Sequence, residues 1–203
     1  EMDISSITKN IVRGLQVSAS DKGTKLDLNL DNTLHTRVFG DPTRLSQVLS
    51  NLLHNAIKFT EQGQVFLNIN LIKQTDKDIT LQFSIKDTGI GISKEKQKLI
   101  FERFTQADSS TSRGFGGTGL GLAISKKILE LQNSTLQLES EEGKGSNFYF
   151  SQTFEKSLQN PEQQEADMNP QTEENKLLSG ITVLLAEDNP INVLVAQKFL
   201  ERW

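Results

Sequence analysis

One stretch of the chain decides how it folds: Asn51-Leu52-Leu53-His54-Asn55-Ala56-Ile57-Lys58-Phe59. On a helix, Asn51, Asn55 and Lys58 fall at i, i+4 and i+7, which places them on one face. The remaining positions are largely apolar and predict packing against a sheet. Amide oxygens can coordinate Mg²⁺, and Lys58 supplies a positive charge for phosphate. The stripe therefore indicates a metal–phosphate site, although a solvated polar face is the alternative.

The sequence also predicts where this helix begins. Asp41-Pro42 combines a capping carboxylate with a proline at the first helical position. An earlier helix is predicted from the cap Asp3 onward, and Gly23 is its expected end. The apolar face of the helix that follows Asp41 is formed by Leu45, Val48, Leu49, Leu52, Leu53, Ala56 and Ile57.

The rest of the pattern mixes strands and helices. Alternating or apolar runs predict strands at 25–31, 64–73, 79–86, 135–140 and 147–153. Two further helices are expected at 93–104 and 120–131, the second with Leu122, Ile124, Ile128 and Leu131 facing inward. This order predicts an α+β fold, a two-layer α/β sandwich in which a mixed sheet packs on helices.

A second informative segment, Asp87-Thr88-Gly89-Ile90-Gly91, directly follows a predicted strand. Glycines in such a loop allow the backbone to approach a flat ligand without a Cβ clash. A carboxylate at the strand end can accept a hydrogen bond from an exocyclic amine such as that of adenine. By itself the segment is also compatible with an ordinary turn.

The third segment is Gly114-Phe115-Gly116-Gly117-Thr118-Gly119-Leu120-Gly121-Leu122, which leads into a predicted helix. Several free backbone N–H groups at a helix N-terminus form a natural anion site. The segment differs from the Walker phosphate loop, because no Gly-Lys-Ser/Thr follows. A flexible linker is the alternative, but alternating Gly and Leu at a helix start favours phosphate binding.

Taken in this order, the three segments resemble the catalytic domain of sensor histidine kinases, which has the GHKL (Bergerat) ATP-binding fold. The resemblance covers approximately residues 3–154 and includes Phe101-Glu102-Arg103-Phe104 as the F box. It implies that Asp87 binds the adenine amine, that Phe59 lies against the base, and that Asn55 holds Mg²⁺ with support from Asn51. It also makes 106–116 the ATP lid. The further ATP contacts that it implies are Lys58, Gly89, Gly91, Ile92, Phe104, Gly117, Thr118, Gly119, Leu120, Gly121 and Leu122. Arg113 and Ser146 are further candidates for ATP contact, with a surface arginine and a hairpin residue as the respective alternatives.

The sequence favours phosphoryl transfer over hydrolysis, with Asn51, Asn55 and Lys58 as the catalytic set. Hydrolytic ATPases of the same fold carry a glutamate base four residues before the metal-binding asparagine, and here that position is Asn51, whose amide cannot accept a proton. The resemblance implies that the acceptor histidine lies on a dimerisation domain outside this chain, because neither His35 nor His54 has a suitable context. A hydrolytic ATPase and a non-catalytic nucleotide-binding module are the alternatives.

The C-terminal part of the chain changes character. We expect the catalytic domain at 1–155, a polar linker at 156–179 and the start of a second domain at 180–203. The stretch Ile181-Thr182-Val183-Leu184-Leu185-Ala186-Glu187-Asp188-Asn189 resembles the first strand of a response-regulator receiver domain. Glu187 and Asp188 would be half of its Mg²⁺ site. A kinase followed by a receiver is the hybrid-kinase arrangement.

Composition excludes several other classes of protein. The 203 residues contain no cysteine, which rules out thiolate catalysis and Cys-ligated zinc. The formal net charge of −4 argues against general nucleic-acid binding. No apolar run approaches the ~20 residues needed to cross a bilayer, and there is no signal peptide. We therefore expect a cytoplasmic domain that does not itself insert into a membrane.

Overall fold

The computed structural model describes residues 1–31, 36–97, 99–101 and 120–157. The chain divides into two units, Glu1–Gln159 and Asn160–Trp203, and every described residue lies in the first. The predictions for the ATP lid, for most of the linker and for the receiver start fall outside the described residues. Within the described residues, no helix is long and apolar enough to span a membrane.

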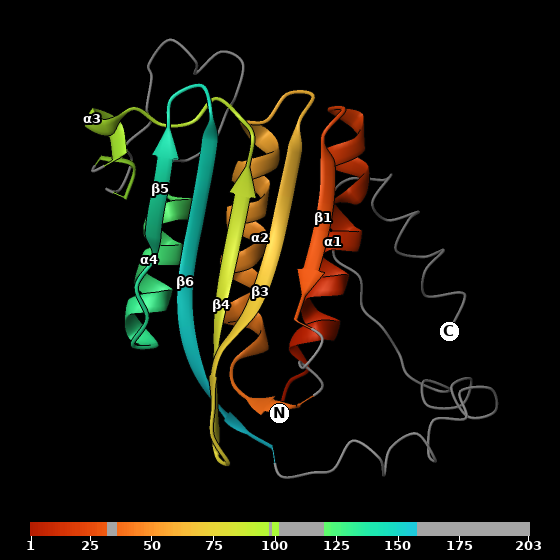
Figure 1. The fold of residues 1–203 in the computed structure, drawn as a ribbon, viewed down its shortest axis with the longest axis vertical. Helices are drawn as coiled ribbons and strands as arrows, with labels where there is room; N and C mark the ends of the chain where they lie inside the picture. The colour runs from red at the N-terminus through yellow and green to blue at the C-terminus, as the bar shows by residue number, and fades with distance from the viewer. Residues whose placement is uncertain (32–35, 98, 102–119, 158–203) are drawn as a thin grey trace, which may run out of the picture. The chain divides into compact units, whose positions relative to one another are not determined.

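A six-stranded mixed sheet forms one layer of the domain (Figure 1). Its order is β1-β3-β4-β6-β2, and β5 also pairs with β6. Only β1 and β3 are parallel, and the other pairs are antiparallel. The strands are β1 (Lys25–Leu30), β2 (Val38–Phe39), β3 (Gln64–Gln74), β4 (Asp78–Asp87), β5 (Gln137–Glu141) and β6 (Gly145–Lys156). The predicted strands are thus confirmed with small shifts of their ends, and β2 is an addition.

Three helices cover one face of the sheet (Figure 1). They are α1 (Ile4–Asp21), α2 (Pro42–Lys58) and α4 (Gly121–Leu131). The Asp3 carboxylate accepts a hydrogen bond from the N–H of Ser6, and Asp41 accepts one from Arg44, each at 3.0 Å, as expected of N-caps. The fold class is therefore confirmed: one mixed sheet packs on one layer of helices.

The predicted helix at 93–104 is only partly correct. It consists of a short α3 (Lys94–Gln97) and a separate 3₁₀ turn, η1 (Leu99–Phe101), and 102–104 lie outside the described residues. The tighter turn brings Ile100 into the core, where it is 9% exposed, and sets the ring of Phe101 edge-on to Phe148 at 6.4 Å. Packing against the core is the physical reason for the break.

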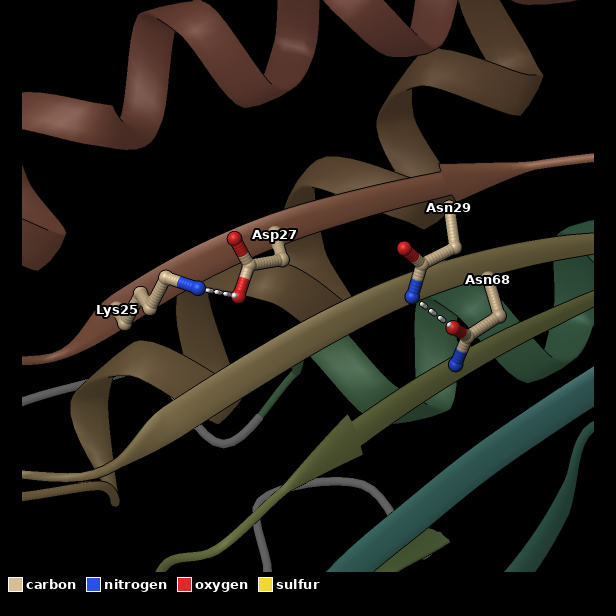
Figure 2. A network of polar contacts seen from close by, with 4 residues as sticks. All are labelled: Lys25, Asp27, Asn29 and Asn68. Carbon is tan, nitrogen blue, oxygen red and sulfur yellow. Dashed lines mark hydrogen bonds and ion pairs between the residues drawn. The ribbon is translucent and has the colours of Figure 1, made fainter.

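The core lies between α2 and the inner face of the sheet. Every predicted apolar position of α2 is buried, each at most 4% exposed. The rings of Phe83 and Phe150 stack at 4.9 Å on neighbouring strands. Figure 2 shows side chains of the opposite, open face, where Lys25 pairs with Asp27 at 2.9 Å and Asn29 donates to Asn68 at 2.8 Å. Apolar and polar residues therefore alternate along the strands as a one-sided sheet requires.

The orientation of α4 differs from the prediction. Ile128 is buried as expected, but Ile124 is 42% exposed and Leu131 is 74% exposed. Ser125 and Leu129 are buried in their place. The exposed side chains line a hollow of about 430 Å³ together with Arg44, Leu120, Ala123, Lys127, Ile128 and Gln132. At the N-terminal end of α4 the small residues Gly121 and Ser125 face Asn51 of α2, and this contact sets the rotation of the helix.

Candidate functional site

The polar stripe on α2 exists as predicted. Asn51, Asn55 and Lys58 are all half-buried, while the apolar residues between them are fully buried. Asp41 and Pro42 set the start of the helix, and the buried residues fix its rotation about its axis. The three polar side chains are therefore held at one border of the core, where they can meet a ligand.

The side chain of Asn51 contacts α4. Its Nδ2 donates to Oγ of Ser125 at 2.8 Å, and Ser125 is 1% exposed. Its Oδ1 lies against the Cα of Gly121, in the space that a Cβ on that residue would need. Both polar atoms of the Asn51 amide thus face α4, and a Cβ at Gly121 would force this amide to move.

Asn55 and Lys58 lie one and two turns further along α2. No hydrogen bond joins the Asn55 side chain to any residue that the structure describes, so its amide oxygen is available to a ligand. The Lys58 ammonium lies 4.9 Å from the centre of the Phe59 ring. Phe59 is 40% exposed, and its ring therefore lies partly at the surface beside a positive charge.

Asp87 is a buried carboxylate at the last position of β4. It is 5% exposed, and burial raises its pKa above the usual value. Hydrogen bonds from the N–H groups of Gly89, at 2.9 Å, and Ser146, at 3.2 Å, oppose that shift. Both end on Oδ1, and Oδ2 accepts no hydrogen bond within the described part of the chain. Asp87 therefore has one anchored oxygen and one oxygen available to a donor.

The loop after Asp87 is fixed by close backbone contacts. A Cβ on Gly89 would collide with the carbonyl oxygen of Phe59, and the N–H of Ile90 donates to that same oxygen at 3.2 Å. Gly91 has φ +66° and no room for a Cβ beside the carbonyl oxygen of Glu141. The sequence analysis explained these glycines by a ligand, but the protein's own backbone already requires them.

Ser146, which the sequence analysis named, pairs behind the loop with Ser140, which it missed. Oγ of Ser140 accepts from the N–H of Ile92 at 2.8 Å and donates to the carbonyl oxygen of Gly145 at 2.9 Å. It also lies 3.0 Å from Oγ of Ser146, the residue whose N–H anchors Asp87. Gln97 adds hydrogen bonds to the carbonyl oxygens of Ile92 and Ser140. This network ties α3, the loop and β5 to the buried carboxylate.

The match to known proteins follows the same segments. The family described as "Histidine kinase-, DNA gyrase B-, and HSP90-like ATPase" matches residues 40–156, which contain α2, the Asp87 loop and α4. The chain belongs to this ATPase family.

Named relatives of the chain are kinases of two-component signalling. It is 39% identical over 202 residues to the sensor histidine kinase AruS of Pseudomonas aeruginosa, covering 100% of this chain and 19% of AruS. It is 36% identical over 205 residues to hybrid signal transduction histidine kinase K of Dictyostelium discoideum, covering 97% of this chain and 17% of that protein. The chain therefore spans about a fifth of the length of these relatives.

Solved structures agree with this assignment. The crystal structure of full-length ShkA in complex with AMPPNP has a TM-score of 0.67 and 30% identity to the chain, covering 77% of the chain and 31% of ShkA. AMPPNP is an ATP analogue, so in ShkA a similar fold accompanies a bound adenine nucleotide.

Of the site's described side chains, we put forward only Asn55 as a ligand for a hard divalent ion. The described residues contain no group of three or more His, Asp or Glu side chains that could hold a metal. The available oxygen of Asn55 is a suitable ligand for Mg²⁺, which usually binds through few protein oxygens and completes its shell with phosphates and water. An ion at this site would therefore depend on the nucleotide.

Several predicted site residues lie outside the described residues: Phe104, Arg113, Gly117, Thr118, Gly119, Glu187 and Asp188. Of the other predicted residues, Gly89 and Ser146 both donate hydrogen bonds to Asp87, and the side chain of Asn51 contacts Gly121. Ile92 contributes its N–H to the serine network and packs against the core. Leu120 is the N-cap of α4 and offers no capping side chain, and Leu122 packs against the core.

Proposed function

We propose that this chain is the ATP-binding catalytic domain of a hybrid sensor histidine kinase. In this proposal it holds Mg–ATP and passes the γ-phosphoryl group to a histidine on a dimerisation domain of the same protein. The catalytic step forms a bond between the imidazole nitrogen and γ-phosphorus while the bond to the leaving oxygen of ADP breaks. The membership in the ATPase family and the names of the relatives support the proposal.

Asp87 is the observation that carries the nucleotide assignment. A buried carboxylate with one oxygen fixed by two N–H groups and the other available is suited to an exocyclic amine. Adenine presents such an amine, whereas guanine presents a carbonyl at the equivalent position. In the proposal, the exposed part of the Phe59 ring packs against the base.

The phosphates lie, in this proposal, between α2 and the N-terminus of α4. The first N–H groups of an α-helix have no partners within the helix, and the Leu120 cap supplies no side-chain acceptor. Lys58 adds a positive charge, and the oxygen of Asn55 holds Mg²⁺ bound to the nucleotide. The ion supplies charge neutralisation, while the protein positions the groups for transfer.

Transfer is favoured over hydrolysis by the state of Asn51. The position that would carry a water-activating base is an amide whose nitrogen donates to Ser125. His54 is the one histidine in the described residues; its ring is exposed, and its Nδ1 lies 2.7 Å from the carbonyl oxygen of Ser50. In this proposal another domain supplies the phosphoacceptor, and the catalytic domain works in the cytoplasm.

The hybrid character rests on the C-terminal sequence. Glu187 and Asp188 follow an apolar stretch as the acidic pair of a receiver does, and one relative is named a hybrid kinase. The receiver domain would be the second partner, and it would take the phosphoryl group from the histidine.

Two measurements test the proposed function. Calorimetry on the purified chain should show reversible binding of Mg–ATP. With labelled ATP, the chain alone should not label itself, but it should label a purified dimerisation domain of the longer protein in trans. Stable label on the chain alone would contradict the assignment of its histidines. ATP binding without transfer would instead indicate the non-catalytic binding module.

A further inference from the structure

We propose that Ser125 is a positioning residue for the phosphate end of the nucleotide site, and that it acts through Asn51. This inference rests on the proposed function. In it, the pair Asn51–Ser125, closed by Gly121, is a latch that holds α4 in a fixed position along α2. The Asn51 amide is then a structural element rather than a ligand of the metal ion.

The latch combines one hydrogen bond with one packing contact. Nδ2 of Asn51 donates to Oγ of Ser125 at 2.8 Å, and Oδ1 of Asn51 packs on the Cα of Gly121. Gly121 and Ser125 are one turn apart on α4, so the flat amide lies across two consecutive turns. Ser125 is 1% exposed, so water does not readily reach its Oγ.

The position of the latch gives it a role in binding. Asn51 is one turn before Asn55 on α2, and Gly121 is the first residue of α4. The latch thus sets the distance between the metal-binding oxygen and the N–H groups proposed for the phosphates. Adenine is recognised elsewhere, by Asp87 on β4, which has no contact with Ser125.

This separation predicts a selective effect on nucleotide binding. Loss of the latch should lower the affinity for a nucleotide more strongly when that nucleotide places more phosphates between α2 and α4. A purely structural serine would change stability but would leave the preference between nucleotides unchanged. The informative quantity is the ratio of the dissociation constant of AMP to that of Mg–ATP.

The test compares two serine variants of the full chain. Ser125→Ala removes the acceptor of the Asn51 amide. Ser134→Ala is the matched control, because Ser134 is 6% exposed and its Oγ donates one hydrogen bond, to the carbonyl oxygen of Ser151 at 2.7 Å, outside the proposed site. Binding of Mg–ATP and AMP is measured by competition with a fluorescent ATP analogue, and folding by chemical denaturation.

We expect the ratio to fall about tenfold in Ser125→Ala, the order of effect of leaving one buried amide without its partner. It should stay at the wild-type value in Ser134→Ala. If Ser125→Ala does not fold, Ser125→Cys provides the same test, since a thiol has nearly the same volume and is a weak acceptor.

An unchanged ratio in a folded Ser125 variant would overturn the proposal, even if its stability fell. Equal weakening of both nucleotides would overturn it as well. Failure of the wild-type chain to bind ATP would refute the proposed function itself, and so the two failures are distinguishable.

Discussion

Replacing Asp87 by Asn should remove nucleotide binding while it preserves the fold. The Asn oxygen can stand in for Oδ1 and accept the same two N–H groups from Gly89 and Ser146. Its NH₂ group then takes the place of Oδ2 and points a donor at the donor of the base. The substitution therefore changes one atom of the site from acceptor to donor.

The size of the effect follows from the hydrogen bond that is lost. A hydrogen bond to a charged group contributes about 1.5–3 kcal/mol, and an unsatisfied buried donor costs about 1–3 kcal/mol more. Together these terms correspond to a loss of affinity of about two to four orders of magnitude. The variant should have the stability of the wild type or exceed it at neutral pH, because burial disfavours the charged carboxylate.

The dependence on pH gives the same prediction a second test. Burial raises the pKa of Asp87 in the folded state above its unfolded value of 3.8. The contribution of Asp87 to the free energy of unfolding is fully present below the unfolded pKa, and it is lost as pH rises through the folded pKa. Acidification should thus stabilise the wild-type domain relative to Asp87→Asn. ATP affinity should fall at a higher pH than an ordinary aspartate would give, because binding needs the carboxylate.

Calorimetry and urea denaturation of the wild type and the variant test both parts. Asp27→Asn is the matched control: Asp27 pairs with Lys25 on the open face of the sheet, and its loss should leave ATP affinity unchanged (Figure 2). Retained affinity in a folded Asp87→Asn domain would refute the role of this carboxylate.

Two further pairs of variants test the architecture. Gly91→Ala should cost roughly 2–4 kcal/mol of unfolding free energy, because it combines φ +66° with a backbone collision at Glu141. Gly143→Ala should cost only about 1 kcal/mol, since its φ of +80° is unfavourable but its surroundings are open; similar losses in urea denaturation would show that the collision is relieved easily. Leu52→Ala, at 0% exposure, should cost about 2–5 kcal/mol. Leu131→Ala, at 74% exposure, should change stability by less than about 0.5 kcal/mol, and a large effect there would mean that the side chain is covered in solution.

The most predictable element was α2, because its signals are local. Asp41 and Pro42 mark its start, and its apolar residues repeat at helical spacing over the whole length. The strands were equally clear, since they alternate on a sheet with one open face. β2 escaped because its two residues, Val38 and Phe39, are too short for any pattern.

The face of α4 was mispredicted for a reason that lies in another part of the chain. Ile124 and Leu131 are large apolar side chains at periodic positions, so they were taken as inward. Asn51 of α2 occupies the space opposite Gly121, and the small residues Gly121 and Ser125 pack against it. Ser125 and Ser140 were missed likewise, because Ser125 is identified by Asn51 and Ser140 by Ile92, and both of these partners are distant in sequence.

The end of α2 joins the two parts of the proposed site. The carbonyl oxygen of Phe59 accepts from Ile90 and lies directly against Gly89, which in turn donates to Asp87. The same helix carries Asn55 one turn earlier and is held to α4 by Asn51. The carboxylate proposed for adenine and the amide proposed for Mg²⁺ are thus connected by rigid backbone rather than by mobile side chains. A transfer reaction depends on the placement of the γ-phosphate. The contacts of α2 with Gly89 and Gly121 are suited to this need, because they hold the adenine and metal ends of the proposed site in a fixed relation.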